Sequence, residues 1–346
     1  MTVSDEHNLM SGSKLKFGLW YSLRNPSAWR RPDTEIYSET LDQIAWAETI
    51  GYDDVWLTEH HFCADGHAPS ILALAAAVAV RTKTIRIGTG VLLLPLHDAV
   101  RVAEDGATVD ILSNGRFELG IGVGYRPEDF TGLGFDRKDR AGRTNEGLEI
   151  IRRLWDGESV DYDGKYYQIS GAKLAPMPVQ QPRPPIWVGG FAPAAAKRAA
   201  RLGDGYIGTG DMTASVPIYH AERERLGLPG PGRLAGGHFW LIVSNDPKRT
   251  FTEVTPHIIY QLQMYNVWMK AAGQATFPQT NNERELRDSG MLLVLSPSQA
   301  VEAIGAYVEA TGIERYYTWT VPPGMPAARM NPHLELFASE VMPHFR

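Results

Sequence analysis

Short apolar runs alternate with amphipathic helical stretches along most of this chain. The helical stretches carry apolar residues at helical spacing, as Leu41, Ile44 and Ala45 do ahead of Gly51, which is expected to end the helix. The alternation predicts eight strands, at Leu15–Tyr21, Asp54–Thr58, Ile85–Gly90, Phe117–Ile121, Ile186–Val188, Tyr206–Ile207, His238–Val243 and Glu314–Thr318. Strands that alternate with helices form a parallel sheet. Such a sheet is either a closed (β/α)8 barrel or an open doubly wound sheet.

The rhythm of strands and helices breaks once, after the expected helix Asp139–Trp155. Ser159–Ile169 alternates in polarity and contains Asp163-Gly164, a strong hairpin signal, and the proline-rich connector Pro176–Pro185 follows. We therefore expect an insertion of a hairpin and loops at the barrel face. The polar stretch Ala271–Gly290 is expected to be a mobile loop. With no clear linker, the sequence predicts a disordered tail over 1–13 and a single domain over 14–346.

Composition excludes several classes of protein. The formal net charge is -6, which argues against a nucleic-acid partner. No apolar run reaches the roughly 18 residues of a membrane span, so no membrane partner is expected. Cys63 is the single cysteine, so an intramolecular disulfide is impossible. The polar N-terminus lacks the apolar core of a secretory signal, and we expect a cytoplasmic protein.

Two histidines follow the second expected strand, in the run Glu59-His60-His61. The carboxyl ends of barrel strands carry active sites, so this place favours chemistry. Adjacent residues on an extended segment point in opposite directions, so His60 and His61 are not expected to share a metal. One of them is expected to act as a base or hydrogen-bond donor beside a cofactor. The alternative is that both only cap the strand by hydrogen bonding.

Glycines follow three other expected strands. Gly88 and Gly90 precede Val91, and Gly120, Gly122 and Gly124 alternate before Tyr125. Glycines at a strand end let a backbone approach a planar ligand closely, although tight packing explains them as well. The pair Gly189-Gly190 leads into a helix that starts near Pro193, and a helix N-terminus with free N–H groups favours a phosphate.

In order along the chain, these segments resemble the bacterial-luciferase-like flavin monooxygenases. The resemblance runs from Lys16–Leu19 through Ala47–Phe62, Ile85–Pro95, Leu112–Arg116, Gly120–Tyr125, Pro185–Gly190 and Ala199–Gly205 to Glu340–Pro343. It implies a (β/α)8 TIM barrel with an insertion, usually a homodimer. It also implies reduced FMN supplied by a separate flavin reductase. Oxygen would add to flavin C4a, and the peroxyflavin would oxidise a small, apolar organic substrate.

The resemblance assigns roles to individual residues. His60 matches the family's catalytic histidine, and Gly90-Val91 matches a pair that is often joined by a cis peptide bond against the flavin ring. The expected cofactor contacts are Glu59, Thr89, Gly90, Val91, Val123, Tyr125, Gly189, Gly190, Phe191 and Thr209. Aromatic and polar residues at strand ends are expected to line the substrate pocket, namely Trp20, Tyr21, His61 and Trp319. The chain lacks the usual phosphate-binding side chains at Val123, Phe191 and Ala194, so the phosphate is expected to rest on the backbone at Gly190–Phe191 with Arg126 nearby. Gly122 stands where the luciferases have a cysteine beside the flavin, so light emission is not predicted.

Other functions fit parts of the same pattern. A relative that uses a deazaflavin coenzyme would move a hydride without oxygen. A non-catalytic flavin-binding subunit would share the fold, but the Glu59-His60-His61 run argues against it. A metal-dependent barrel hydrolase would need metal ligands at a spacing that this sequence does not have, so no metal is predicted.

Overall fold

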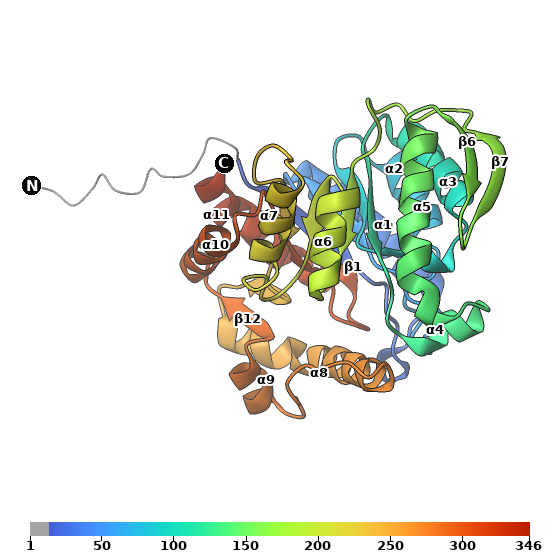
Figure 1. Ribbon diagram of the computed structural model, residues 1–346. Helices are drawn as coiled ribbons and strands as arrows, with labels where there is room; N and C mark the ends of the chain where they lie inside the picture. The colour runs from blue at the N-terminus through green and yellow to red at the C-terminus, as the bar shows by residue number, and fades with distance from the viewer. Residues whose placement is uncertain (1–13) are drawn as a thin grey trace, which may run out of the picture.

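Eight parallel strands close into a barrel in the computed structural model, which describes residues 14–346 (Figure 1). The predicted tail over 1–13 lies outside the described residues. The barrel strands follow one another in the order β1 (Lys16–Tyr21), β2 (Asp54–Leu57), β3 (Arg86–Thr89), β5 (Phe117–Gly122), β8 (Ile186–Gly189), β9 (Gly205–Ile207), β10 (Arg233–Gly236) and β13 (Arg315–Trp319). Pairing of β13 with β1 and of β3 with β5 closes the ring. The barrel is confirmed and the open sheet is excluded.

Eight helices form the outer layer of the barrel. They are α1 (Asp33–Thr49), α2 (Ile71–Arg81), α3 (Ala99–Ser113), α5 (Arg140–Trp155), α6 (Pro193–Leu202), α7 (Val216–Arg225), α10 (Pro297–Thr311) and α11 (Asn331–Glu340). Local signals fix some of their ends. Asp98 accepts the backbone N–H groups of Val100 and Arg101 at the start of α3, and Ser296 forms a capping box with Gln299 at the start of α10.

Aromatic side chains fill the barrel interior, and part of the glycine pattern serves to admit them. Trp56 and Trp187 are fully buried and meet edge to face, with ring centroids 6.0 Å apart. A Cβ atom at Gly88 would collide with the Trp56 ring, and one at Gly205 would collide with the Trp187 ring. These glycines are therefore explained by core packing rather than by a ligand.

The hairpin consists of β6 (Ser159–Asp163) and β7 (Gln168–Lys173), which pair antiparallel as predicted. It lies on the outside of the barrel, where it packs along the outer side of α5 and the Tyr162 hydroxyl donates to Glu149 at 3.2 Å (Figure 1). The hairpin follows the amino-terminal end of the barrel because it continues from the last residue of α5.

The predicted seventh strand was wrong. The seventh barrel strand is β10, and the segment predicted for it contains β11 (Trp240–Val243), which pairs in parallel with β12 (Leu292–Leu295) in a separate sheet. The stretch β10 has the sequence Arg-Leu-Ala-Gly, which carries little strand propensity. Small residues are needed there because a Cβ atom at Gly237 would collide with the backbone of Tyr317.

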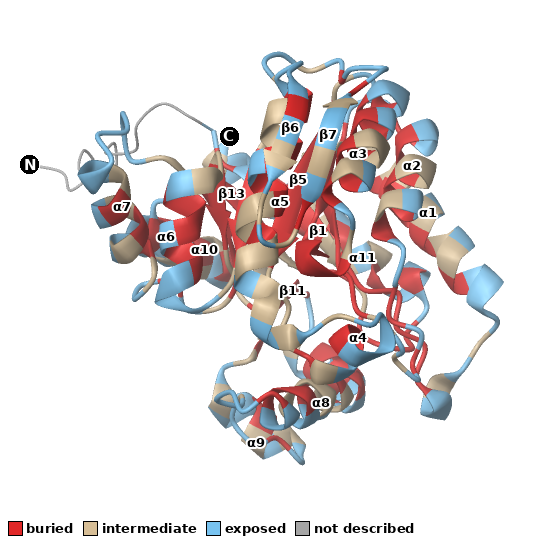
Figure 2. Cartoon of the chain, turned by 45° about the vertical axis from the view of Figure 1, so that its right-hand side comes forward, coloured by how far each residue is buried: buried red, intermediate tan, exposed pale blue. Residues whose placement is uncertain are grey.

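A second insertion therefore lies between β10 and α10. It contains β11, α8 (Pro247–Ala271), α9 (Glu283–Ser289) and β12, and it covers the carboxyl end of the barrel together with α4 (Pro127–Gly132) (Figures 1 and 2). The segment Ala271–Gly290, predicted as a loop, is in part helical because α9 lies within it. Among the described helices, none is both long and apolar enough to cross a bilayer.

Candidate active site

His60 lies just beyond β2, at the carboxyl end of the barrel. Its side chain is buried, and its Nδ1 donates to Oδ2 of Asp129 at 2.8 Å. Asp129 has no exposed surface. Among the hydrogen bonds of residues 14–346, the His60 ring takes part through Nδ1 and not through Nε2. A buried carboxylate on one ring nitrogen fixes the imidazole and leaves the other nitrogen for chemistry.

Asp129 is the residue that sequence reasoning missed. It stands in the first turn of α4, which starts at Pro127, and its Oδ1 accepts the His61 N–H at 3.1 Å and Arg126 Nη1 at 2.8 Å. One carboxylate therefore holds the His60 ring and the backbone next to it. Asp129 and His60 lie 69 residues apart, so no local pattern joins them. The available sequence signal was an acidic residue in the first helical turn after the glycine-rich end of β5.

Glu59 and His61 face away from His60, as the alternation of an extended segment predicts. Oε1 of Glu59 accepts from Nε2 of His61 at 2.6 Å and from Nε2 of His97 at 2.7 Å. Oε2 accepts the Leu93 N–H at 2.7 Å. Both carboxylate oxygens are engaged by these contacts, so Glu59 ties β2 to the segment after Val91.

The charges in this group reinforce one another. Burial alone would raise the pKa of Glu59, but the charge of His97 and the hydrogen bonds from His61 and His97 outweigh it and lower the pKa to about 2. Burial disfavours the charged form of His97, but the Glu59 carboxylate outweighs burial and raises the pKa of His97. A carboxylate oxygen of Glu59 and one ring nitrogen each of His61 and His97 lie within 4.8 Å of one another. They satisfy each other by hydrogen bonds, so the structure gives this group a structural explanation.

The peptide bond between Gly90 and Val91 is cis, as the family resemblance implied. The Gly90 carbonyl accepts from Nε1 of Trp20 at 2.7 Å. Thr89, also expected to contact the cofactor, is fully buried, and its hydroxyl donates to the Gly120 carbonyl at 2.6 Å. Thr89 therefore joins β3 to β5 and supports the segment that carries the cis bond.

Two glycines make room for the Val91 side chain. A Cβ atom at Gly122 would lie 2.6 Å from Cγ2 of Val91, and one at Gly189 would lie 2.9 Å from Cγ1. Val91 is half-buried at the barrel mouth, so these two glycines set the position of an apolar surface there.

Gly122→Ala is expected to displace Val91, because carbon atoms do not approach to 2.6 Å. We expect a loss of stability of about 1–3 kcal/mol, measured by chemical denaturation. Gly305→Ala in α10 is the matched control, since nothing lies within 4 Å of its Cβ position. Equal stability of the two variants would show that the Val91 side chain does not need the space at Gly122.

The turn Gly189–Phe191 leads into α6. Gly190 has φ +139°, a conformation that favours glycine, and its carbonyl accepts from the Tyr206 hydroxyl at 2.7 Å. No side chain caps the start of α6, and Phe191 is exposed. Pro193 has no N–H and the Ala195 N–H donates to the Ala192 carbonyl at 2.8 Å, which leaves the Ala194 N–H available to an anion. Val123 is half-buried at the end of β5, whose partner strand is β8, and the Thr209 hydroxyl donates to Gly237 at 3.4 Å.

The predicted pocket residues fall into two groups. Trp20 and Trp319 stack at the mouth, with centroids 4.0 Å apart and an interplanar angle of 14°. The prediction for Tyr21 was wrong, since its hydroxyl donates to Gln43 of α1 at 2.9 Å on the outer side of the barrel. The reason is that neighbouring residues of β1 point to opposite faces of the sheet.

The carboxyl-terminal half of α8 lies over His60. The Trp268 ring is 5.0 Å from the His60 ring, and Tyr265 is 6.4 Å from it. Arg126 also lies over Trp268, with its guanidinium carbon 5.0 Å from that ring. Arg126 was expected near the phosphate turn, but its guanidinium instead contacts Asp129 and the His61 carbonyl.

Two further polar side chains surround His60. The Tyr125 ring lies 5.6 Å away, and burial raises the pKa of its hydroxyl well above the usual range. The His67 ring lies 5.0 Å away, and burial lowers its pKa well below the usual range, so His67 is neutral. The Thr58 hydroxyl donates to the Tyr21 carbonyl at 3.0 Å and accepts from Nε2 of His67 at 2.8 Å. Nδ1 of His67 is then an unprotonated acceptor.

The sequence model described as luciferase-like monooxygenase matches residues 15–314. The chain belongs to the luciferase-like monooxygenase family. It is 24% identical to the oxygenase component of flavin-dependent trigonelline monooxygenase from Acinetobacter baylyi over 96% of both chains. It is 38% identical to an F420-dependent glucose-6-phosphate dehydrogenase from Amycolatopsis mediterranei over 178 residues, which span 49% of this chain and about half, 53%, of that relative.

The fold agrees with that of a solved family structure. The oxygenating constituent of 3,6-diketocamphane monooxygenase from Pseudomonas putida, solved in complex with FMN, superposes with a TM-score of 0.81 at 23% identity, over 96% of this chain and 99% of that one. At this identity the likeness concerns the fold.

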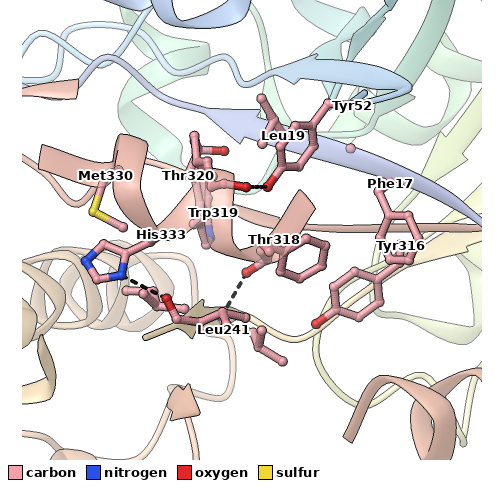
Figure 3. A pocket seen from close by; sticks show the side chains of 15 residues that line it. Phe17, Leu19, Tyr52, Leu241, Tyr316, Thr318, Trp319, Thr320, Met330 and His333 are labelled. Atoms are coloured by element: carbon pink, nitrogen blue, oxygen red, sulfur yellow. Dashed lines mark hydrogen bonds between the residues drawn. The ribbon is translucent and has the colours of Figure 1, made fainter. Parts of the chain in front are cut away.

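One cavity of this luciferase-like barrel lies away from His60, between the barrel wall and β11 (Figure 3). Its lining is mainly apolar, and apart from Nε1 of Trp319, which has no partner in the described residues, its polar groups are paired. Thr318 Oγ1 accepts the Leu241 N–H at 3.0 Å, and Nδ1 of His333 donates to the Val243 carbonyl at 2.8 Å. The cavity marks the seam at which the second insertion rests on the barrel.

Proposed function

We propose that this chain is a monooxygenase that uses reduced FMN and molecular oxygen to oxidise a small organic substrate. The observation that carries the proposal is the His60–Asp129 pair, in which a buried carboxylate orients the imidazole and leaves Nε2 unpartnered at the barrel mouth. The full-length match to a flavin-dependent oxygenase component supports the same reading.

The residues at the mouth fit a flavin. The Gly90–Val91 backbone and the Val91 side chain offer an apolar surface for a ring, and Gly122 and Gly189 keep the neighbouring strand ends free of Cβ atoms. The uncapped start of α6 and the Gly190 turn offer N–H groups for a phosphate. When bound, reduced FMN supplies electrons and activates dioxygen.

The chain's own residues then control protons and water. His60 holds or releases a proton at Nε2, while the Asp129 carboxylate stabilises the charged ring. Trp268 and Tyr265 of α8 cover His60 and keep water from it. Exclusion of water protects an oxygen-transfer reaction from loss as hydrogen peroxide.

We also propose that the electrons come from a separate flavin reductase, because the trigonelline enzyme that matches over the full length is named as an oxygenase component. A homodimer, which the family resemblance implies, and a cytoplasmic location belong to the same proposal. The mass of the purified protein in solution checks the homodimer, and cell fractionation checks the location.

A deazaflavin-dependent hydride transfer is the second candidate, and the 38% identity to an F420-dependent dehydrogenase over 178 residues favours it. The barrel mouth would serve either ring system. In that reaction His60 would handle a proton without oxygen.

Parallel anaerobic titrations with reduced FMN and with reduced F420 separate the two functions. Tight binding of reduced FMN, followed by oxygen consumption on exposure to air, supports the monooxygenase. Tight binding of F420 together with no affinity for reduced FMN would replace it with hydride transfer.

A further inference from the structure

Arg24 lies in the segment after β1 with no exposed side-chain surface. Its Nε donates to Oδ2 of Asp65 at 2.6 Å, and that oxygen also accepts from the Tyr260 hydroxyl at 3.0 Å. Nη1 and Nη2 of Arg24 are buried and have no hydrogen-bond partner anywhere in residues 14–346. One edge of a buried guanidinium is therefore used, and the other is not.

The unused edge is chemically specific. A guanidinium is always charged in proteins, and buried charged donors without partners are unfavourable. Nη1 and Nη2 together form the end-on fork that binds a carboxylate through two parallel hydrogen bonds. Arg126 does not offer this fork, because its Nη1 is engaged by Asp129 and the His61 carbonyl.

Arg24 and His60 contact the same indole. The guanidinium carbon of Arg24 lies 4.9 Å from the Trp268 ring, and the His60 ring lies 5.0 Å from it. Tyr265 lies 5.4 Å from the Arg24 guanidinium carbon. Two further unpartnered atoms belong to rings next to His60, the Tyr125 hydroxyl and Nδ1 of His67. Unfilled polar groups thus surround the proposed catalytic histidine on several sides.

We infer that the end-on edge of Arg24 binds the carboxylate of a cyclic or aromatic acid, and that this acid is the substrate presented to His60. The inference deepens the proposed function and rests on it. The ring of the acid would lie among the aromatic side chains of α8, which must shift to admit it because they now cover Arg24. Nδ1 of His67 and Oδ1 of Asp65 are free acceptors for a proton donor of the ligand.

The selection is for a carboxylate rather than for negative charge in general. Arg24 and Arg126 are balanced by Asp65 and Asp129, so the surroundings carry no clear excess of positive charge. A carboxamide of the same shape would keep one acceptor oxygen but would turn its NH2 group toward the N–H groups of Arg24. The four unfilled donors therefore distinguish the acid from its amide.

Calorimetric titration of the whole protein with benzoate, 2-naphthoate, their carboxamides and inorganic phosphate tests the inference, with and without reduced FMN. We expect at least one carboxylate to bind roughly 10- to 100-fold more tightly than its amide. Arg24→Gln should remove that preference, and Arg24→Lys should restore only part of it, because an ammonium lacks the fork. Arg30→Gln, an exposed arginine on the same segment, is the matched control and should leave it unchanged.

Equal binding of acids and amides by the wild-type protein would overturn the inference without any variant. Tighter binding of phosphate than of both carboxylates would overturn the choice of a planar acid, as would an undiminished preference in Arg24→Gln. Binding of reduced FMN is measured separately in each variant. Its absence from the wild-type protein would reject the proposed monooxygenase, whereas normal FMN binding without a carboxylate preference would reject only the role of Arg24.

Discussion

His60→Asn is expected to lower product formation by roughly 10²-fold or more, within the range of general acid–base catalysis. Asparagine retains an N–H group that can donate to Asp129 in place of Nδ1, but it removes the unpartnered Nε2. Binding of reduced FMN should therefore persist while oxygen consumed is released increasingly as hydrogen peroxide. The measurements are the product formed and the peroxide released for each oxygen consumed.

Asp129→Asn supplies the matching test of positioning. Its amide no longer favours the Nδ1–H tautomer of His60, so we expect a large loss in rate as well. Because Asp129 acts through His60, the double variant should be about as slow as His60→Asn alone. Additive losses would show that the two residues act separately, and normal coupling in His60→Asn would remove His60 from the chemistry.

Glu59→Gln is expected to destabilise the fold by about 3 kcal/mol, because breaking a buried ion pair leaves its partners uncompensated. The loss should depend on pH. The lowered pKa of Glu59, about 2, adds stability that is complete above its ordinary value near 4.5 and is lost as pH falls toward 2. The raised pKa of His97 adds stability that is complete below its ordinary value of 6.5 and is lost as pH rises through the raised value.

The difference in unfolding free energy between wild type and Glu59→Gln should thus be largest between about pH 4.5 and 6.5 and smaller in alkaline solution. Chemical denaturation at several pH values measures it. Asp42→Asn removes an exposed ion pair with Arg81 and should change stability by less than about 0.5 kcal/mol at any pH. A difference for Glu59→Gln that does not vary with pH would contradict the ionic account.

Local patterns in the sequence were enough to predict alternating strands and helices and to place His60 at a strand end, because periodicity depends on neighbouring residues. The alternation left a closed barrel and an open sheet as alternatives, and the family resemblance favoured the closed barrel. The family resemblance added the cis bond at Gly90-Val91. The opposite orientations of His60 and His61 followed from the geometry of an extended chain.

The remaining features depend on contacts between distant residues. Asp129 is distinguished from other acidic residues only by the His60 ring that it meets. Arg24 is distinguished by donors that no residue of 14–346 fills. The seventh strand was misplaced because Trp240–Val243 is strongly apolar, whereas β10 has the sequence Arg-Leu-Ala-Gly, which carries little strand propensity. Single-sequence propensity favours the former segment.

The second insertion packs on the barrel through a shared hydrophobic cluster, in which Trp240 of β11, Phe251 of α8 and Leu292 of β12 meet Trp319 of β13. Its chain leaves the barrel after Gly236 and returns at Ser296. The oxygen chemistry proposed for His60 and Asp129 belongs to one part of the molecule, and the aromatic residues over Arg24 belong to another. Recombination at these two points between relatives should therefore exchange the aromatic surface that faces the substrate, while carboxylate binding by Arg24 and the reaction type stay with the recipient barrel.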